Sequence, residues 1–574
     1  MPLPDQRWIT QPAQAQLVQQ LADELNLSPL VAQVLVSRGK NSLEAAQTFL
    51  HPETWQLPDP REHFSDLTPA LDCLEQAVRT GQPIAICGDY DADGMTSTAL
   101  LLRTFRQLGA KASYEIPSRA HDGYGINERM VLELAQRGVS VILTVDNGIV
   151  AFDPIAKAKA LGLTVIITDH HEPSPDGKLP VADAILNPKL IPVDSPFRGL
   201  AGVGVAYVLA CLLAERFNQR KQLAGELLEL FTLGTIADMA PLTGVNRRWV
   251  RWGLQRLPHS NLAGIQALIE VTRQGRGEAF RPDAVGFGLG PRINAMGRID
   301  DPRVVIELLT TDFAARAKEL ALVCEEINRE RQQLCKQIEQ EAVAWLGQNP
   351  IDFAAERVLL LVQENWHHGV IGIVASRLKE RYGVPVFIGS LSTTEVRGSA
   401  RGIPEFHVFE ALEFCKDLLA KHGGHEAAGG FSLDPANLPN LRQRLRQFAT
   451  GCLKPEQLRP LVEIDACADL ADLSLELMAQ LDQLQPCGIG NPEPIFCSRG
   501  LQVIEQRTMG QENAHLRLTV RDKTGTRINA VAWRWGAHCP LPEQVDLAYK
   551  LRTNTWKEKT SLQLELVGAR PSTC

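Results

Sequence analysis

Gly88-Asp89-Tyr90-Asp91-Ala92-Asp93-Gly94 directly follows a short apolar run at Pro83–Cys87. The apolar run predicts a buried strand, and the polar stretch predicts a loop at its carboxyl end that leads into a helix at about Thr96–Leu108. Strands that alternate with helices predict a parallel sheet with helices on both faces. The alternation continues with two strand patterns and two helical patterns: Val139–Val145, Leu163–Thr168, Asn127–Arg137 and Phe152–Leu161.

Each of the three predicted strands runs into polar residues. The second strand is followed by Asp146-Asn147-Gly148, and the third by Asp169-His170-His171. Because ligands of open α/β sheets bind at the carboxyl ends of the strands, we expect these loops to converge. A fourth acid, Asp238, lies in the mostly apolar stretch Thr235–Pro241.

Each motif alone has an ordinary explanation. The first is also compatible with a calcium loop or a solvated turn, Asp-Asn-Gly is usually a turn, and a His-His pair is more often structural. Taken together, acids at successive strand ends add no stability unless a cation neutralises them. A pair of divalent ions about 3.5–4 Å apart needs several carboxylates and performs in-line displacement at phosphorus. Carboxylates with imidazole favour Mn²⁺ or Mg²⁺.

The composition limits the class of protein. The length of 574 residues predicts about three to five domains. The 59 basic and 67 acidic residues give a net charge of −8, and 44% of the residues are hydrophobic. These values exclude a disordered chain, a collagen, a coiled-coil rod and a histone-like protein. A local basic groove that binds nucleic acid remains compatible with them.

The cysteines and the absence of long apolar runs predict a compartment. The chain has 12 cysteines and no C-x-x-C pair, which argues against a zinc ribbon or finger. Its start resembles no secretory signal, and no apolar run reaches the roughly 20 residues that cross a bilayer. We therefore expect a cytoplasmic protein with free thiols and no membrane partner.

The fold class expected is α/β, with two α/β lobes, a long connecting helix and a small β-barrel. A helical segment at 1–60 precedes a first lobe at 61–311, and a stretch almost without Gly and Pro predicts a connector helix at 312–346. A second lobe at 347–455, with a helix at Phe406–Lys421, precedes a barrel domain at 456–574. Five short strands indicate the barrel: Leu501–Glu505, Leu516–Val520, Ile528–Trp533, Leu547–Thr553 and Ser561–Val567.

Three further segments are candidates for binding phosphate or a strand. Gly423–Gly430 is rich in glycine and could approach a phosphate closely before a following helix, or could be only a tight turn. Arg397–Gly402 holds two guanidiniums and a hydroxyl, which suit phosphate or a solvated turn. In the barrel, a basic and aromatic strand pair fits either strand binding or ordinary packing: Lys550, Arg552, Trp556, Lys557 and Lys559, facing Trp533, Arg534 and Trp535.

The four acidic motifs resemble those of the DHH phosphoesterase superfamily. Gly88–Gly94 and Gly288–Arg298 resemble, within it, the single-strand-specific exonucleases, and this resemblance spans about residues 80–574. It implies DHH and DHHA1 lobes and an OB-fold. It also implies 5′→3′ hydrolysis of single-stranded DNA to 5′-mononucleotides, in repair and recombination, with two Mn²⁺ or Mg²⁺ ions.

The resemblance also implies roles for individual residues. Asp146 would bridge the two ions, His171 would act at the leaving group or orient the scissile phosphate, and Asp169 would brace its loop. Several members carry a His ligand where Cys87 stands, so we expect Asp89 to supply that ligand. The implied metal ligands are Asp89, Asp91, Asp93, Asp146, His170 and Asp238, and the implied catalytic residues are Asp91, Asp93, Asp146 and His171.

For the substrate, the resemblance implies a terminal phosphate site and contacts along the strand. Ser399 and Arg401 would hold the 5′ phosphate, and His425 would contact a phosphate near the metals. The implied substrate-binding residues are Arg292, Arg298, Arg377, Ser399, Arg401, Gly423, Gly424, His425 and Trp556.

Two other functions are compatible with parts of the pattern. One is a DHH phosphodiesterase of short oligonucleotides or cyclic dinucleotides, which needs neither a barrel nor a long connector helix. The other is a strand-binding scaffold without metals, which the full set of acids and imidazoles disfavours. For the exonuclease we expect a monomer that binds single-stranded DNA, with a helicase or a single-strand-binding protein as candidate partners.

Overall fold

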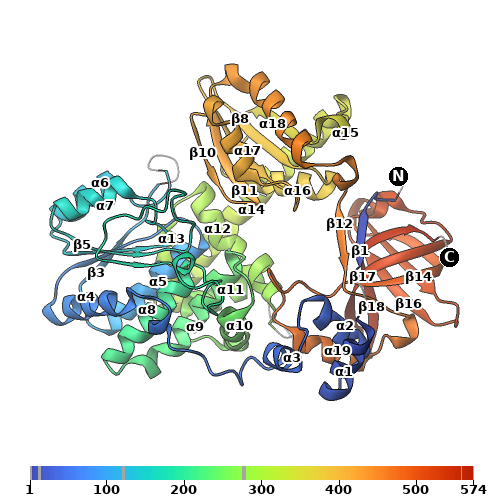
Figure 1. The fold of residues 1–574 in the computed structure, drawn as a ribbon, viewed down its shortest axis with the longest axis horizontal. Helices are drawn as coiled ribbons and strands as arrows, with labels where there is room; N and C mark the ends of the chain where they lie inside the picture. Colours follow the sequence, from blue (N-terminus) through green and yellow to red (C-terminus); the bar gives the residue numbers. More distant parts are fainter. Residues whose placement is uncertain (1–2, 11–13, 119–122, 274–279, 557–558, 573–574) are drawn as a thin grey trace. The chain divides into compact units, whose positions relative to one another are not determined.

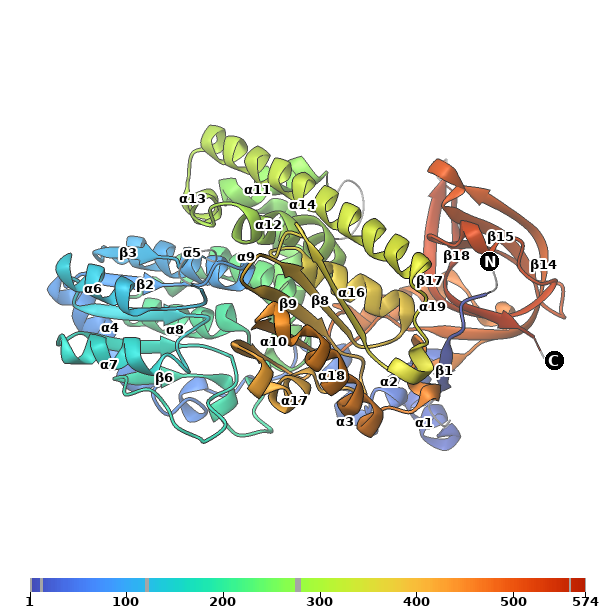
Figure 2. The same cartoon turned by 90° about the horizontal axis from the view of Figure 1, so that it is seen from above.

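The computed structural model describes residues 3–10, 14–118, 123–273, 280–556 and 559–572, without the side chains of Trp556 and Lys559. The chain forms two compact units. One comprises His51–Arg331 and Gln485–Pro492, and the other comprises the remaining segments. Figures 1 and 2 draw their elements from two directions. Among the described residues, no helix combines the length and apolar character that a bilayer span requires.

The first unit is built on a five-stranded parallel sheet with the strand order β3-β2-β4-β5-β6. The three predicted strands are confirmed, whereas the two edge strands, β3 and β6, were not expected from the sequence. β3 mixes polar and apolar residues, and β6 is apolar but only three residues long, so neither stands out as a strand pattern. The bounds are β2 Ile84–Cys87, β3 Ala112–Glu115, β4 Val141–Val145, β5 Thr164–Thr168 and β6 Ala184–Leu186.

Helices cover both faces of this sheet (Figure 1). Alternate strand residues point to opposite faces, so Ile84 and Ile86 enter one core and Ala85 and Cys87 the other. The first core contains α4, α5 and α8, and the second contains α6 and α7. Their bounds are α4 Leu67–Thr80, α5 Ala92–Gln107, α6 Glu128–Gln136, α7 Phe152–Ala160 and α8 Gly202–Arg216.

Further helices extend the first core on the side of α5 and α8. A remote segment, 485–492, also belongs to this unit: the backbone N–H of Leu242 donates to the carbonyl of Ile489 at 2.7 Å. The helices are α9 Arg220–Ala237, α10 Gly244–Arg256, α11 Ala263–Thr272, α12 Gly290–Ile299 and α13 Arg303–Thr310. The predicted connector is confirmed as one 35-residue helix, α14 Ala314–Gln348.

The second lobe has a mixed sheet in the order β10-β11-β9-β8-β7, in which only β7 and β8 run parallel. Helices α17 and α18 share a core with this sheet, and α16 packs against β8 and β9. The strands are β7 Leu359–Glu364, β8 Val386–Leu391, β9 Val396–Arg401, β10 Lys421–Gly424 and β11 Ala428–Leu433. The helices are α15 Phe353–Glu356, α16 Ile371–Tyr382, α17 Val408–Phe414 and α18 Leu438–Cys452.

Two expectations for this lobe are wrong. The helix predicted at Phe406–Lys421 ends at Phe414. The glycine-rich segment precedes no helix but forms a β-hairpin, in which Gly423 pairs with Gly430 and Gly424 with Gly429. Gly424 has a φ of 151°, and a Cβ there would lie 2.4 Å from the Ala428 carbonyl oxygen. Glycine therefore serves a tight hairpin here, and the local run of glycines disfavours a helix.

The C-terminal domain is a closed barrel in the order β14-β15-β16-β18-β17, closed by the pairing of β17 with β14. Only β16 and β18 pair in parallel within this ring. The five predicted strands and the OB-like barrel are thus confirmed. The strands are β13 Ala466–Cys467, β14 Phe496–Met509, β15 His515–Arg521, β16 Arg527–Ala532, β17 Gln544–Trp556 and β18 Lys559–Pro571.

The N-terminal helices share the core of this barrel. Leu21, Val34 and Phe49 belong to one hydrophobic cluster with Leu516 and Leu564 of the barrel. A short N-terminal strand, not expected from the sequence, pairs in parallel with β12. The bounds are β1 Arg7–Thr10, α1 Ala15–Leu25, α2 Pro29–Ser37, α3 Leu43–Leu50, β12 Leu461–Ile464 and α19 Leu475–Leu481.

Candidate metal centre

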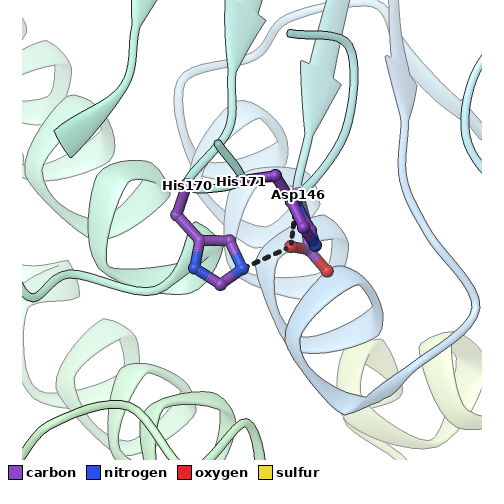
Figure 3. Close-up of side chains that lie close together, drawn as sticks. All are labelled: Asp146, His170 and His171. Carbon is purple, nitrogen blue, oxygen red and sulfur yellow. Dashed lines mark ion pairs between the residues drawn. The ribbon is translucent and has the colours of Figure 1, made fainter. Parts of the chain in front are cut away.

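Acids and imidazoles from four loops meet at the carboxyl end of the parallel sheet. Nε2 of His170 lies 3.1 Å from Oδ1 of Asp146, 3.6 Å from Oδ2 of Asp93 and 4.0 Å from Oδ2 of Asp238. Figure 3 shows His170 and His171 beside the carboxylate of Asp146. Three sets of side chains each bring their ligand atoms within 4.8 Å of one another: Asp146, His170 and His171; Asp93, His170 and Asp238; Asp89, Asp91 and Asp146.

Backbone N–H groups hold two of the acids in place. Asp91 caps α5, because its Oδ1 accepts from the N–H groups of Asp93 and Gly94 at 2.9 and 3.1 Å. Both oxygens of Asp93 accept from the first turn of α8, from Gly202 and Val203 at 2.6 Å each. A helix N-terminus favours negative charge, so this contact stabilises the buried carboxylate.

Gly202 is required by the crowding at this contact. A Cβ at Gly202 would lie 2.8 Å from the Cβ of Asp146 and 3.0 Å from Oδ2 of Asp93. Real Cβ atoms do not approach other atoms so closely without displacing them. The start of α8 therefore fits against two candidate ligands only because residue 202 has no side chain.

The acids raise one another's pKa. Burial, followed by the charge of Asp91, raises the pKa of Asp93 to about 7. Burial and then the charge of Asp93 raise the pKa values of Asp146 and Asp238 well above the ordinary value. A cluster in which burial and like charges both oppose ionisation is stabilised by a bound cation.

Asp146 has the geometry of a shared ligand. Its Oδ1 is buried, and among the described residues no donor makes a hydrogen bond to it, although Nε2 of His170 is near. Asp146 belongs to two of the three ligand sets, and its φ is 61°, in the left-handed region. Backbone strain of this kind is retained where the site needs a side chain in one direction. The donor set fits one or two divalent cations with oxygen and imidazole ligands.

The two histidines differ in charge state. Burial and the neighbouring His171 lower the pKa of His170 to about 4, so His170 offers a neutral imidazole nitrogen, the form that binds metals. Burial also lowers the pKa of His171, but its hydrogen bond to Asp169 and the charge of that residue outweigh burial, and the net shift is upward. Nδ1 of His171 lies 2.8 Å from Oδ1 of Asp169.

Asp169 braces its loop, as expected. Its carboxylate accepts from the backbone N–H groups of Ile149 at 2.9 Å, His170 at 2.7 Å and His171 at 3.1 Å. Burial raises the pKa of Asp169, yet these donors and His171 outweigh it and leave the pKa below the ordinary value. Asp169 is thus an ionised anchor rather than a member of the three ligand sets.

Cys87 lies apart from these sets. It is buried in the core beneath α6 and α7, and burial, followed by the charge of Glu115, raises the pKa of its thiol to about 12. A neutral thiol is a poor metal ligand. Asp89, which the sequence offered as the replacement, lies with Asp91 and Asp146 in one ligand set.

Sequence reasoning missed two side chains at this site. The hydroxyl of Tyr124 donates to the carbonyl of Asp146 at 2.6 Å and lies 3.1 Å from Nδ1 of His171. The amide of Asn147, treated as part of a turn, donates to the carbonyls of Cys87 and Val145 and so ties two strand ends together. Neither residue stands in a pattern that indicates such contacts, because Tyr124 contacts His171 across 47 positions and Asn147 contacts Cys87 across 60.

Two predicted phosphate ligands of the first unit lie on α12. This helix touches the first acidic loop, since the side chain of Asn294 accepts from the N–H of Ala92 at 2.9 Å. Arg298 lies near the end of α12. Arg292 forms an ion pair with Glu325 at 2.8 Å and donates to the carbonyl of Gly288. The charge of Arg292 is therefore already neutralised.

In the second lobe, Ser399 and Arg401 lie beside the N-terminus of α16. A Cβ at Gly372 would lie 3.0 Å from Nη2 of Arg401 and 3.3 Å from Oγ of Ser399. Burial alone lowers the pKa of Arg401, and among the described residues no carboxylate forms an ion pair with it. The N-cap residue of α16, Val370, supplies no side-chain cap. The first N–H groups of α16 and a guanidinium that no described carboxylate neutralises thus lie together, and their chemistry suits an anion.

The remaining predicted ligands of the second lobe lie elsewhere. Arg377 forms an ion pair with Glu339 at 2.7 Å. Gly423 and Gly424 lie in the hairpin, and His425 is exposed at its turn. The side chain of Trp556 lies outside the described residues.

Two members of the basic strand pair of the barrel are neutralised, whereas Lys557 and the side chain of Lys559 lie outside the described residues. Lys550 and Arg552 both bind Glu493, at 2.7 and 2.5 Å, and Arg552 also binds Glu565. The interpretation of these two residues as a strand-binding pair is therefore unsupported.

Four arginines on the outer face of β14, β15 and β16 differ from that pair. Register places Arg507 opposite Arg517 and Arg521 opposite Arg527, and like charges in such positions repel. Within the described parts of the chain, no acid forms an ion pair with any of the four. Trp533, half exposed, follows β16 on the same side.

The domain composition matches known families. Sequence models of three families match: the DHH family, N-terminal domain, at 83–235, the DHHA1 domain at 353–451, and the RecJ OB domain at 464–568. The single-stranded-DNA-specific exonuclease RecJ of Bacillus subtilis (strain 168) is 36% identical over 575 residues, which cover 99% of this chain and 71% of that protein. Its namesake in Escherichia coli (strain K12) is 34% identical, covering 94% and 95%.

A solved structure agrees with the whole fold. The crystal structure of RecJ in complex with Mn²⁺ from Thermus thermophilus superposes with a TM-score of 0.84 at 31% identity, covering 99% of this chain and 80% of that chain. The Mg²⁺ complex from the same organism has a TM-score of 0.77 at 29% identity, covering 99% and 79%.

Asp146 and Asp169 are predicted to have opposite effects on the stability of the metal-free protein. The raised pKa of Asp146 opposes folding at neutral pH, and Asp146→Asn relieves this cost, so we expect its melting temperature to rise by about 2–4 °C per kcal/mol gained. Asp169→Asn removes an ionised acceptor of several N–H groups and should lower stability by about 1–3 kcal/mol. Calorimetry in chelator measures both. Equal destabilisation by the two variants would show that the cluster is not repulsive.

Proposed function

This chain belongs to the RecJ family of single-stranded-DNA-specific exonucleases. From that premise we propose that it hydrolyses a single strand from its 5′ end. The acidic cluster is proposed to carry out the hydrolysis, and two cationic surfaces are proposed to bind the strand. The proposed products are 5′-mononucleotides. The proposed metal ligands are Asp89, Asp91, Asp93, Asp146, His170 and Asp238.

The observation that carries this proposal is that these residues form three overlapping ligand sets, two of which contain Asp146, whose Oδ1 is buried. The three overlapping ligand sets support two adjacent cations, with Asp146 as the shared ligand. Bound Mn²⁺ or Mg²⁺ would supply Lewis-acid activation of water and neutralise charge at phosphorus. The metal-bound RecJ structures from Thermus thermophilus support both ions.

His171 is proposed to act on the phosphate or the leaving oxygen. Its contact with Asp169 holds a proton on Nδ1 and favours the charged imidazolium. An imidazolium beside the acidic cluster can donate a hydrogen bond to a phosphate oxygen or a proton to the departing group. Tyr124, which bonds to both Asp146 and His171, would fix the orientation of that ring.

The anion site of Ser399, Arg401 and the α16 N-terminus is proposed to bind the terminal 5′ phosphate. A guanidinium binds phosphate with two parallel hydrogen bonds, and an unneutralised one gains most from an incoming anion. Recognition of this end would set 5′→3′ polarity and release of mononucleotides. Arg298 and His425 remain proposed contacts of the same strand.

The arginine face of the barrel is proposed to bind the strand farther along. Repulsion between Arg507 and Arg517, and between Arg521 and Arg527, is relieved when phosphates lie between them. The outer face of an OB-fold barrel binds oligonucleotides in this way. The alternative function, hydrolysis of short oligonucleotides or cyclic dinucleotides, gives no role to this face.

The cellular setting follows from the proposed substrate. Single-stranded DNA arises during repair and recombination in the cytoplasm, where a helicase or a single-strand-binding protein would be the candidate partners. The proposed domains are 61–311 for hydrolysis, 347–455 for the strand end and 456–574 for the strand, with 312–346 as the connector and 1–60 as an N-terminal segment, whose helices α1–α3 share the barrel core.

The first test compares a 5′-phosphorylated single strand with its duplex in a time course with Mn²⁺, Mg²⁺ or chelator. We expect mononucleotides from the single strand only, and none in chelator. Asp146→Asn should lose more than about 100-fold in rate, because a metal ligand matters more than its supporting residues. A variant as active as the parent would contradict the assignment of Asp146, and cleavage restricted to dinucleotides would favour the alternative.

The second test addresses the strand end. Arg401→Ala should reduce the preference for 5′-phosphorylated over 5′-hydroxyl ends by about tenfold or more, since a hydrogen bond to a charged group contributes about 1.5–3 kcal/mol. Arg397→Ala is the matched control: it lies on the same face of β9, about 13 Å along the strand, and is neutralised by Glu395. If both variants lost this preference equally, the assignment of the terminal phosphate to this site would be wrong.

The third test addresses the barrel. The double variant Arg507→Ala and Arg517→Ala should weaken binding of a long single strand and reduce the slope of log affinity against log salt by about 1.4, or about 0.7 for each lost contact. Lys550→Gln removes a cation that Glu493 already neutralises, so its slope should stay at the parental value. If the parent, the double variant and Lys550→Gln had the same slope of log affinity against log salt, the strand would bind to another surface.

A further inference from the structure

Two cysteines of the barrel domain stand side by side on neighbouring strands. Cys467 of β13 pairs in register with Cys497 of β14, and the two strands run parallel. Paired residues of a parallel ladder point to the same face, with Cα atoms about 5 Å apart. That separation lies inside the range of about 4.4–6.8 Å that a disulfide spans.

The two thiols differ in access. Cys467 is exposed, whereas Cys497 is 1% exposed. An oxidant can therefore reach the first sulfur, and the second lies beneath it as a partner that solvent does not reach. Such a pairing of an accessible and a shielded thiol is the arrangement of a reactive cysteine with a resolving cysteine.

Nearby cations favour the thiolate of Cys467. Its hydrogen bond with Cys497, and then the guanidiniums of Arg499 and Arg570, outweigh burial and lower the pKa of Cys467 to about 6. The same interaction raises the pKa of Cys497, so Cys467 is the more acidic thiol of the pair. Arg570 also binds Asp546 at 3.1 Å, while Arg499 interacts with both sulfurs.

We propose that Cys467 and Cys497 form a redox-active dithiol that a hydroperoxide converts into an intramolecular disulfide. The Cys467 thiolate attacks the distal oxygen of the peroxide, breaks the O–O bond and becomes a sulfenic acid, while hydroxide or alkoxide leaves. The Cys497 thiol then attacks the sulfenic sulfur, forms the S–S bond and releases water. The peroxide is reduced by two electrons and the two thiols are oxidised by two.

The disulfide encloses a defined part of the chain. The loop between residues 467 and 497 contains α19 and the segment 485–492, which belongs to the other compact unit. Closing this loop constrains the unfolded chain. We therefore expect the oxidised protein to melt at a higher temperature than the reduced one.

Another exposed cysteine provides an internal control. Cys452 is exposed like Cys467, but burial, the first of several influences, raises its pKa. At pH 7 we expect iodoacetamide to alkylate Cys467 about tenfold faster than Cys452, because its larger thiolate fraction outweighs its lower nucleophilicity. Peptide mapping after short exposure gives both rates in the same sample.

The decisive experiment treats the full chain with a small excess of hydrogen peroxide at pH 7. The parent and Cys452→Ser should lose two thiols per chain and give a peptide that links residues 467 and 497. Cys497→Ser should stop at a sulfenic acid on Cys467, trapped by dimedone, and Cys467→Ser should give neither product.

Three results would overturn the proposal: a cross-link between other cysteines, no cross-link in the parent, or equal alkylation of Cys467 and Cys452. Serine at the exposed position 467 should not disturb folding. If the buried Cys497→Ser variant fails to fold, the proposal is still tested by the cross-link in the parent and by the ratio of the alkylation rates of Cys467 and Cys452 in the parent.

Discussion

Mutual repulsion among carboxylates buried at one end of a parallel sheet is the constraint on which the rest of this site depends. Asp93, Asp146 and Asp238 all have raised pKa values because burial and their neighbours oppose ionisation. The fold offsets part of this cost with backbone donors from the ends of α5 and α8, which bind Asp91 and Asp93. The repulsion that these donors leave uncompensated favours the binding of cations, which would neutralise the carboxylates.

The arginines of this protein fall into two groups by the same reasoning. Arg292, Arg377 and Arg552 each meet an acid at 2.5–2.8 Å, so their charges contribute to packing between elements. Arg401 and the four outer arginines of the barrel meet no acid among the described residues. Leaving a cation without a counter-ion costs stability, and a polyanionic strand is the ligand that would supply the missing charge. Arginines that are paired with acids therefore have a structural role, whereas arginines without an acid partner among the described residues can bind a negatively charged substrate.

Local patterns were sufficient for much of the fold. The apolar runs before Asp89, Asp146 and Asp169 indicated buried parallel strands, and the connector helix and five barrel strands followed from periodicity. The edge strands give too little signal for a prediction, because β3 is only partly apolar and β6 has only three residues. The hairpin at Gly423–Gly424 was mistaken for a turn before a helix, since glycine permits either structure and only pairing with β11 distinguishes them.

By itself, the sequence determined that acids and imidazoles end successive strands, because strand order and residue type are local properties and parallel strands share one carboxyl edge. Only the tertiary structure decided which of these groups lie together as candidate ligands, which anchor a loop and which lie apart. Asp169 is an anchor because its carboxylate accepts from N–H groups of its own loop and of a neighbouring loop. Cys87 is buried in a core, and Tyr124 contacts His171, 47 positions away in the chain. Hydrogen bonds, burial and neutralisation depend on neighbours in space, and no spacing in the chain encodes them directly.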